Sequence, residues 1–492
     1  MSETTAIRFG TDGWRGVIAK DFTFANVARV ASAIAQFLVS KERRALDVYH
    51  RWGVEYRGPE RGVVVGYDTR FLSREFAIHL GQILQDHKIP VLVSKETVPT
   101  PALSYAIREH KAAAGVMITA SHNPAEYNGI KVKLDYGGPA PPQATQIIEK
   151  LLPSEVPEPK TSEHELNFVD FRKIYLARVR QIIDVKLLKN APLFVMVDAM
   201  YGSGRGYLAE LLKDLEIRYA LVRGGDNPRF GGKNPEPIEK NLSPLRAVMA
   251  SEKLRKKSRE FLVGVVTDGD GDRVGAMDEL GQVIDSHRCF ALILRHLLSK
   301  GWTGKVVKSF TLSDMVDKIC VKHRIEMEEV PVGFKFACEK MIREDVLMGG
   351  EESGGFGIKH HIPERDGILM SLLLLEIVAK AGKPASQVVE DLMQDVGYHY
   401  YDRRDLHLET GLEIVDRVKR KPPKEIAGFK VQKIELLDGI KLRFSHGWLL
   451  MRASGTEPLL RLYCEMDTPE KVKIILDEAE RFAQGEMELW VK

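Results

Sequence analysis

The sequence predicts an α/β protein in which three tandem α/β/α domains are followed by a smaller C-terminal α+β domain. Its 492 residues correspond to about three domains at ~150 residues each, and they suffice for several separate hydrophobic cores. A strand–helix–strand pattern occurs three times, and its strands are almost continuously apolar, which is typical of sheets covered on both faces. The final part of the chain instead has alternating, half-buried strands.

The elements expected in the three repeats are short apolar strands and helices with one buried face. The strands lie at 62–66, 89–93, 112–119, 193–197, 220–222, 261–267, 305–309 and 346–348. The helices lie at 75–84, 207–215, 313–323 and 367–381. An earlier helix is indicated by apolar residues at i, i+3 and i+4 spacing, namely Val27, Val30, Ala31, Ile34 and Leu38. The alternation of strands and helices predicts βαβ units.

The final domain is expected to contain alternating strands at 441–444 and 459–463 and one closing helix. Thr468 is a suitable N-cap for that helix, with Pro469 in its first turn. Proline-rich stretches at 139–142 and 153–159 separate the first domain from the second. The predicted domains are 1–158, 159–284, 285–395 and 396–492.

Composition excludes several classes of function. Lys and Arg total 72 against 69 Asp and Glu, so no strong charge predicts a nucleic-acid partner or a membrane surface. The longest apolar run, 368–379, is too short to span a bilayer, and the first residues lack the features of a secretory signal. The four cysteines are widely spaced and form no CxxC pair, which favours a reducing cytosol. A cytoplasmic, multidomain enzyme is therefore expected.

The first candidate site is the segment 119–124, Thr-Ala-Ser-His-Asn-Pro, directly after an apolar strand. Ligands of open α/β sheets bind at the carboxyl ends of the strands. Ser121, flanked by His122 and a proline-fixed turn, is therefore placed as a nucleophile or phosphate carrier. The alternative is an ordinary Ser/Asn turn between two elements.

The second candidate site is Asp268-Gly-Asp-Gly-Asp272-Arg273, which also follows an apolar strand. Three alternating carboxylates can converge on a hard divalent cation, and without one they would repel each other. An EF-hand loop is excluded because Arg273 occupies the position that needs glycine and a strand precedes the loop. Magnesium combines a few carboxylates with a phosphate oxygen, so a phosphorylated ligand is expected nearby.

Two further loops are weaker signals. The segment 349–355, Gly-Gly-Glu-Glu-Ser-Gly-Gly, offers Glu351 and Ser353 as acceptors for a polyhydroxylated ligand, although such clusters are commonly ordinary loops. The segment 452–458, Arg-Ala-Ser-Gly-Thr-Glu-Pro, has the side chains and exposed amides of a phosphate cradle. The alternative for the second loop is a solvated turn between two strands.

Taken together with Phe-Gly-Thr-Asp-Gly-Trp-Arg-Gly at 9–16, these loops give the chain a resemblance to a known family. The chain resembles the α-D-phosphohexomutase superfamily, the phosphoglucomutase/phosphomannomutase family, with the motifs in order from Phe9 to Pro458. The resemblance implies a heart-shaped protein of four domains, three with mixed sheets, and one central active site. It also implies an intramolecular phosphotransferase, which is an isomerase.

The resemblance assigns roles to individual residues. Ser121 would be a phosphoserine that donates and regains a phosphoryl group, and its phosphate would bind one Mg²⁺ per chain with Asp268, Asp270 and Asp272. The catalytic group would be completed by basic residues, with Lys131 as the acid/base partner: Arg15, Lys131, His122 and Arg273. The sugar phosphate would be bound by Glu351, Ser353, Lys335, Arg452, Ser454, Gly455 and Thr456.

The expected substrate is a hexose phosphate, and the sugar loop favours glucose. Glu352 is similar to glucose-type members, whereas glucosamine-type members tend to have Gln, and Gly355 replaces a His that is frequent in mannose/glucose members. The expected function is a phosphoglucomutase that interconverts glucose 1- and 6-phosphates, with glucose 1,6-bisphosphate as intermediate and activator. The alternatives are action on mannose phosphates, a phosphoglucosamine mutase, a bisphosphate synthase or an inactive sugar-phosphate sensor. A monomer or homodimer is expected.

Overall fold

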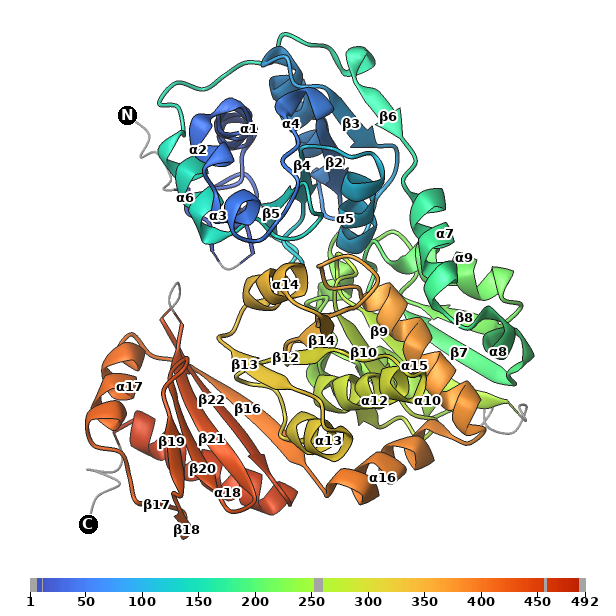
Figure 1. Ribbon diagram of the computed structural model, residues 1–492, viewed down its shortest axis with the longest axis vertical. Helices are drawn as coiled ribbons and strands as arrows, with labels where there is room; N and C mark the ends of the chain where they lie inside the picture. The colour runs from blue at the N-terminus through green and yellow to red at the C-terminus, as the bar shows by residue number, and fades with distance from the viewer. Residues whose placement is uncertain (1–6, 11, 252–259, 455–457, 486–492) are drawn as a thin grey trace. The chain divides into compact units, whose positions relative to one another are not determined.

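The computed structural model describes residues 7–10, 12–251, 260–454 and 458–485. The chain forms two compact units, the first from Met1–Lys305 and Gly333–Val388, the second from Val306–Val332 and Val389–Lys492. Figure 1 identifies the elements by label and colour. Within the described residues, no helix is both long and apolar enough to cross a membrane. All four cysteines are buried and free of disulfides.

The first sheet has six strands in the order β1-β5-β4-β2-β3-β6. Their bounds are β1 (Trp14–Val17), β2 (Val63–Tyr67), β3 (Val91–Ser94), β4 (Ala114–Ile118), β5 (Tyr127–Leu134) and β6 (Asn167–Val169). The central strands β3, β2 and β4 are parallel, while β5 is antiparallel to both β4 and β1. The sheet is therefore mixed, and the fully buried valines of β2 explain its continuously apolar sequence.

Helices and short 3₁₀ turns accompany the first sheet. They are α1 (Phe24–Val39), α2 (Lys41–Arg44), α3 (Asp47–His50), η1 (Pro59–Arg61), α4 (Ser73–Asp86), α5 (Thr100–Glu109), α6 (Pro142–Lys150) and η2 (Glu163–Glu165). Thr23 caps α1 by accepting a hydrogen bond from the Asn26 amide. Strand β6 pairs with β3 although it lies beyond residue 158, so the chain stays attached to this sheet past the predicted first boundary.

The second sheet has five strands in the order β11-β10-β9-β7-β8, in which β9, β7 and β8 are parallel and β10 and β11 antiparallel. The strands are β7 (Leu193–Asp198), β8 (Arg218–Val222), β9 (Phe261–Thr267), β10 (Val274–Met277) and β11 (Val283–Ile284). The helices and turns are α7 (Arg172–Ile182), α8 (Val185–Asn190), α9 (Arg205–Asp214), η3 (Phe230–Gly232), η4 (Glu239–Asn241) and α10 (Ser243–Met249).

The rest of the first unit contains β14 (Val346–Gly350), β15 (Phe356–Ile358), α12 (Ser286–Ser299), α14 (Phe334–Arg343) and α15 (Gly367–Ala381). Strands β14 and β15 are antiparallel. Helix α15 is buried along most of its length, which explains its nearly uniform apolar sequence. Helix α16 (Ala385–Val396) includes the point at which the chain passes into the second unit.

The second unit is built around a five-stranded antiparallel sheet in the order β16-β22-β21-β20-β19. Its elements are β12 (Lys305–Ser309), α13 (Met315–His323), β13 (Met327–Val330), β16 (Tyr400–His407), α17 (Gly411–Arg420), β17 (Glu425–Ile426), β18 (Phe429–Lys430), β19 (Lys433–Glu435), β20 (Ile440–Phe444), β21 (Gly447–Ala453), β22 (Leu459–Met466) and α18 (Pro469–Ala483). Strands β12 and β13 are parallel. As predicted, Thr468 caps α18 by accepting from the Lys471 amide.

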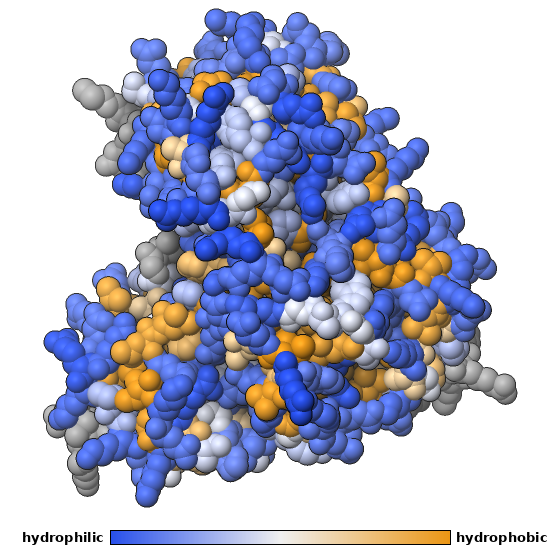
Figure 2. Space-filling view, in the orientation of Figure 1, coloured by the Kyte–Doolittle hydropathy of each residue, from blue (hydrophilic) through white to orange (hydrophobic). Residues whose placement is uncertain are grey.

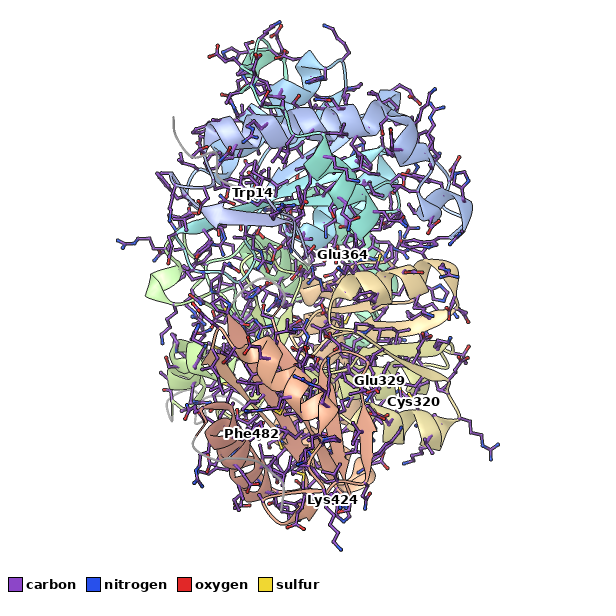
Figure 3. The ribbon with its side chains drawn as sticks, turned by 90° about the vertical axis from the view of Figure 1, so that its left-hand side faces the viewer. Trp14, Cys320, Glu329, Glu364, Lys424 and Phe482 are labelled. Carbon is purple, nitrogen blue, oxygen red and sulfur yellow. The ribbon has the colours of Figure 1, made fainter. Side chains whose placement is uncertain are left out.

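The two faces of that sheet have separate cores. One face packs against apolar residues of α17 and α18, among them Phe482, which is labelled in Figure 3. On the other face Trp448, Leu450 and Tyr463 pack with Phe310. In the space-filling view of Figure 2 the visible surface is mostly hydrophilic and is interrupted by separate apolar patches.

The structure confirms the predicted α/β fold class. Each predicted strand and helix of the three repeats is present, and its ends differ from the prediction by two residues or fewer. Many other elements were not anticipated, among them helices α5, α7, α12 and α14 and strands β5, β10 and β13. The sequence of β13, Met-Glu-Glu-Val, has two acidic residues in four and so lacks the apolar pattern used to find strands.

Candidate active site

The serine loop begins where β4 ends, and Ser121 is held there in a strained backbone conformation. Its φ of 52° lies in the left-handed region, which a non-glycine residue seldom adopts. The side-chain oxygen of Thr119 accepts a hydrogen bond from the Ser121 amide at 2.8 Å. Backbone strain of this kind persists only where the surroundings fix it, and it concentrates at functional sites.

A buried arginine, Arg70, fixes the rest of this loop. Its two terminal nitrogens donate to four backbone oxygens of the loop, those of Ser121 (2.7 Å), Asn123 (2.7 Å), Pro124 (2.6 Å) and Tyr127 (3.0 Å). Asp68 pairs with Arg70 Nε at 3.2 Å and also accepts from the Thr119 hydroxyl at 2.6 Å. The pair follows β2 and had no motif to identify it in the sequence.

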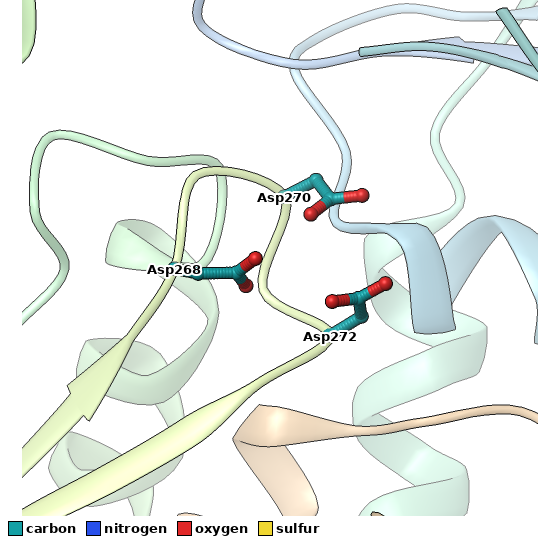
Figure 4. A group of neighbouring side chains, drawn as sticks. All are labelled: Asp268, Asp270 and Asp272. Atoms are coloured by element: carbon teal, nitrogen blue, oxygen red, sulfur yellow. The ribbon is translucent and has the colours of Figure 1, made fainter. Parts of the chain in front are cut away.

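The acidic loop follows β9 and brings its three aspartates together. Figure 4 shows the side chains of Asp268, Asp270 and Asp272 directed toward one space. One carboxylate oxygen from each lies within 4.8 Å of the others, and all three residues are fully buried. Gly269 is needed for the close approach of the serine loop, because a Cβ there would lie 2.4 Å from the Ser121 carbonyl oxygen.

The serine and acidic loops meet directly. The Ser121 hydroxyl donates to Asp268 Oδ2 at 2.9 Å, and His122 Nδ1 lies 3.4 Å from the same hydroxyl oxygen. Burial, with the nearby Arg273 and Arg15, holds the pKa of His122 well below its usual range. The lowered pKa favours the neutral form of the histidine.

A buried lysine compensates much of the acidic charge. Lys131, on β5, lies 2.8 Å from Asp270 Oδ2 and 2.9 Å from both Asp272 Oδ2 and Asp12 Oδ2. Burial opposes its charge, but the three carboxylates raise the pKa of Lys131 above its ordinary value. The structure thus places the Lys131 ammonium group between Asp12 and two of the metal-site carboxylates.

The acidic group also has the features expected of a Mg²⁺ site. Asp270 Oδ1 and Asp272 Oδ1 are buried, and neither has a hydrogen-bond partner among the described residues. Burial, together with the charges of Asp272 and Asp270, raises the pKa of Asp268 well above its ordinary value. A hard divalent cation would satisfy the orphaned oxygens and relieve this repulsion, so the three aspartates fit the ion.

The other predicted basic residues lie around this centre. Arg15, on β1, donates to the Asn123 side chain at 2.7 Å, next to the serine loop. The Arg273 amide donates to Asp268 Oδ1 at 3.1 Å, and its guanidinium group lies 3.4 Å from Glu236. Burial lowers the pKa of Arg15 from its usual value.

The predicted sugar loop also reaches this centre. Glu351 is buried and accepts from the Gly333 amide at 2.9 Å, just before Lys335 at the start of α14. Burial raises the pKa of Glu351 to about 7, although Arg365 opposes the shift. The loop that carries Ser353 is attached to the acidic loop, because the Val274 amide donates to the Gly354 carbonyl at 2.9 Å.

Arg365 joins the acidic centre to the sugar loop and was missed in the sequence. It forms an ion pair with Asp12, lies 2.8 Å from Asp272 Oδ2 and 3.8 Å from Glu351 Oε2. The neighbouring Glu364, labelled in Figure 3, is buried and pairs with Lys133. The segment Pro-Glu-Arg-Asp at 363–366 carries dense charge just before an apolar helix, which was the available signal.

The predicted phosphate-binding residues belong to the second unit. Arg452, on β21, has its Nε 2.9 Å from Asp438 Oδ1. The Ser454 amide donates to the Leu459 carbonyl at 2.8 Å. Across the strand pair, Arg452 is directly opposite Arg461, so two cations share one face. The predicted ligands Gly455 and Thr456 lie outside the described residues.

Comparison with known proteins gives matches along most of the chain. Models of the phosphoglucomutase/phosphomannomutase alpha/beta/alpha domains I, II and III match residues 6–157, 173–281 and 285–396, and the C-terminal domain model matches 414–481. A phosphoglucomutase/phosphomannomutase of Thermococcus kodakarensis is 31% identical over 479 residues, covering 95% of this chain and 96% of the relative.

Two other relatives carry different names. A phosphoglucosamine mutase of Limosilactobacillus reuteri is 28% identical, covering 98% of this chain and 99% of the relative. The crystal structure of a "putative phosphomannomutase" from Thermus thermophilus is 36% identical, with a TM-score of 0.85, and covers 98% of this chain and 100% of that one. The chain therefore belongs to the phosphoglucomutase/phosphomannomutase family, and it is an isomerase of the phosphohexomutase type.

Proposed function

We propose that the protein is a phosphoglucomutase that interconverts glucose 1-phosphate and glucose 6-phosphate through a phosphoserine at Ser121. The observation that carries this proposal is the 2.9 Å hydrogen bond from the Ser121 hydroxyl to Asp268 within the acidic group. A phosphoryl group on that oxygen would lie beside the carboxylates that fit Mg²⁺. A sensor that only binds sugar phosphates would need neither the buried serine nor this group.

In the proposed reaction the serine first donates its phosphoryl group to the free hydroxyl of a hexose monophosphate. The bond between Ser121 Oγ and phosphorus breaks as a bond from phosphorus to the sugar oxygen forms, giving glucose 1,6-bisphosphate. The sugar hydroxyl loses a proton in this step, and the released Ser121 Oγ gains one. The bisphosphate then turns over and returns its other phosphoryl group to Ser121. The same ligand, added in trace amounts, would phosphorylate an unmodified serine and so activate the enzyme.

The protein's own residues would position and neutralise these groups. Asp268, Asp270 and Asp272 would hold Mg²⁺, which when bound would offset the negative charge on the phosphoryl oxygens. Lys131 is the proposed acid/base partner, and because its carboxylate partners raise its pKa it would begin as the acid, in the ammonium form. Arg15, His122 and Arg273 would complete the catalytic group. Because these side chains are already fixed by buried contacts, little reorganisation is needed during transfer.

The proposed sugar-phosphate ligands are divided between two loops. Glu351, Ser353 and Lys335 would bind the sugar, while Arg452, Ser454, Gly455 and Thr456 would bind the phosphate that is not transferred. Arg452 would bind that phosphate through a charge-assisted, potentially bidentate pair. In the structure it pairs with Asp438, and Arg461, opposite it on β22, lies 3.8 Å from Asp405. Glucose is proposed over glucosamine because Glu352 stands where glucosamine-type members tend to have Gln, and over mannose because Gly355 stands in place of the His frequent in mannose/glucose members.

The relatives are named for three different sugars, so the substrate is tested by comparing the phosphates of all three. Glucose, mannose and glucosamine 1-phosphates are each supplied with Mg²⁺ and a trace of the matching 1,6-bisphosphate. We expect the highest kcat/KM with glucose 1-phosphate, because a site that hydrogen-bonds a particular hydroxyl discriminates strongly against an altered one. A clear preference for mannose or glucosamine would change the substrate and leave the phosphoserine mechanism in place. Net accumulation of bisphosphate would indicate a synthase.

The proposal also covers the organisation of the chain. We propose domains at 1–158, 159–284, 285–395 and 396–492, with β6 of the second segment reaching back to pair with β3 of the first sheet. We also propose a cytoplasmic location and a monomer or homodimer. The tests are size-exclusion chromatography with light scattering for the oligomeric state, and limited proteolysis for the boundaries.

A further inference from the structure

Asp438 lies beside Arg452 because of the tight start of strand β20. In the pairing of β20 with β21, Ile440 is opposite Met451, so the two residues before Ile440 reach the end of β21 that carries Arg452. Gly439 has a φ of 96°, and a Cβ there would lie 2.4 Å from the Met451 carbonyl oxygen and 3.2 Å from Arg452 Cα. Only glycine fits this approach, and it fixes the preceding Asp438 against the arginine.

The carboxylate of Asp438 has two partners in the second unit. Its Oδ1 lies 2.9 Å from Arg452 Nε, and its Oδ2 accepts a hydrogen bond from the Val332 amide at 2.9 Å. The backbone amide holds the carboxylate, and the carboxylate attracts the guanidinium group as an ion pair, because the geometry at Nε is not that of a hydrogen bond. Both side chains remain partly accessible, at 17% for Arg452 and 22% for Asp438.

We infer that Asp438 is a positioning residue that holds Arg452 in the orientation in which it binds the non-transferred phosphate of the sugar. This inference rests on the proposed function of Arg452. A long arginine side chain loses rotational freedom when it binds a ligand, and a partner that has already ordered it reduces that loss. Asp438 neutralises Arg452 while no phosphate is bound, as Asp405 does for Arg461 on the opposite strand.

An alternative role for the same contact predicts the opposite change in phosphate affinity. A carboxylate on Arg452 could compete with the incoming phosphate, in which case its removal would tighten binding. A purely structural role through Val332 would weaken binding equally with and without Arg452. The three roles are separated by substitutions of Asp438, a substitution of Arg452 and a double variant.

The experiment measures the Kd of glucose 6-phosphate by calorimetry, with kcat and KM in both directions, for Asp438→Asn, Asp438→Ala, Arg452→Ala and the Arg452→Ala/Asp438→Ala double variant. Asn keeps an oxygen for the Val332 amide and removes the charge, so the fold is preserved. We expect Asp438→Asn to raise Kd and KM by about 3- to 10-fold, with kcat changed less than about twofold. In the Arg452→Ala background, Asp438→Ala should add almost nothing.

The matched control is Asp477→Asn, which breaks an ion pair with Arg404 on the helical side of the same sheet and should leave Kd and KM unchanged. Tighter binding by Asp438→Asn, or equal effects of Asp438→Ala in both backgrounds, would overturn the positioning role while Arg452→Ala still shows the proposed function. Unchanged binding in Arg452→Ala would refute the phosphate cradle itself. No binding by the parent protein would refute the proposed function and the positioning role together.

Discussion

The charged side chains of the acidic centre in the first unit and those around Arg452 in the second unit differ in their exposure to solvent. In the first unit, Asp268, Asp270 and Asp272 are fully buried and Lys131 is 1% exposed. In the second unit, Arg452 and Asp438 keep about a fifth of their surface in contact with solvent. Buried and mutually fixed charges suit a chemical step, whereas partly solvated ones suit a ligand that must enter and leave.

This contrast predicts that substitutions in the first unit reduce turnover and those in the second reduce binding. The largest effect is expected for Ser121→Ala, which removes the proposed phosphoryl carrier and keeps the Cβ and the backbone strain of the parent. Turnover should fall on the order of 10³-fold or more. The measurement is the coupled rate from glucose 1-phosphate, with circular dichroism and thermal melting to confirm the fold. Activity near the parent's would refute the carrier role.

Next is Asp270→Asn, which removes one anionic oxygen from the proposed metal group. We expect a loss on the order of 10²-fold in kcat and a raised Mg²⁺ requirement, because a hard cation prefers carboxylate oxygens. The measurement is the rate as a function of Mg²⁺ concentration. Asp214→Asn, which breaks a surface ion pair with Arg180, is the control. Full parent activity after exhaustive chelation would contradict the metal site.

A smaller effect, confined to binding, is expected for Arg452→Ala. Hydrogen bonds to charged groups contribute roughly 1.5–3 kcal/mol, which corresponds to about a 10- to 100-fold loss of kcat/KM in both directions. The loss should appear mainly in KM, and free glucose 1,6-bisphosphate should escape more often during turnover. Arg452→Lys should recover only part of the activity, because it lacks the planar fork. The assay is steady-state kinetics with rapid-quench analysis of free bisphosphate. Rates of the variant that equal those of the parent, in either direction, would exclude the cradle role.

The smallest effect is a dependence of kcat/KM on pH that arises from Glu351. Burial raises the pKa of this side chain to about 7. As pH rises through 7 the side chain ionises and accepts stronger hydrogen bonds from sugar hydroxyls, so kcat/KM should rise a fewfold. Glu351→Gln should flatten this rise. A pH–rate profile from about 5.5 to about 8.5 for both proteins brackets the pKa and makes the comparison. An identical rise in the two would assign it to another group.

The same residue predicts a stability change of known sign. A carboxyl whose folded pKa is about 7, above its ordinary value of 4.5, binds more protons in the folded state than in the unfolded state. Its contribution to the free energy of unfolding is therefore fully present below pH 4.5 and is lost as pH rises toward 7. As pH rises across this range, the Tm of the parent should fall relative to the Tm of Glu351→Gln.

Features that depend on neighbouring residues could be predicted from the sequence, whereas contacts between residues far apart in the chain could not. Strands such as β9 and helices such as α15 were predicted with their observed bounds, because hydrophobic periodicity is local. The loops with Ser121 and Asp268 were found because each follows such a strand. Their direct contact at 2.9 Å joins residues 147 positions apart, and only the fold shows it.

Residues whose role depends on several distant partners were missed. Arg70 holds backbone oxygens that lie 51 to 57 positions further along the chain, and Arg365 pairs with Asp12, 353 positions away. Neither lies in a glycine-rich or repeated motif, so the surrounding sequence did not identify either one as a site residue. A lone arginine is ordinarily a solvated surface residue, and only its burial identifies it.

The central claim is that Ser121 carries the phosphoryl group that the sugar receives. Its most direct test is single-turnover transfer from protein labelled with ³²P by incubation with labelled glucose 1,6-bisphosphate, mixed rapidly with excess glucose 1-phosphate. Peptide mass spectrometry should locate the label on Ser121 before mixing, and the label should leave the serine as fast as it appears in hexose phosphates. Label on another residue, or label that stays on Ser121 while glucose 6-phosphate forms, would contradict the account.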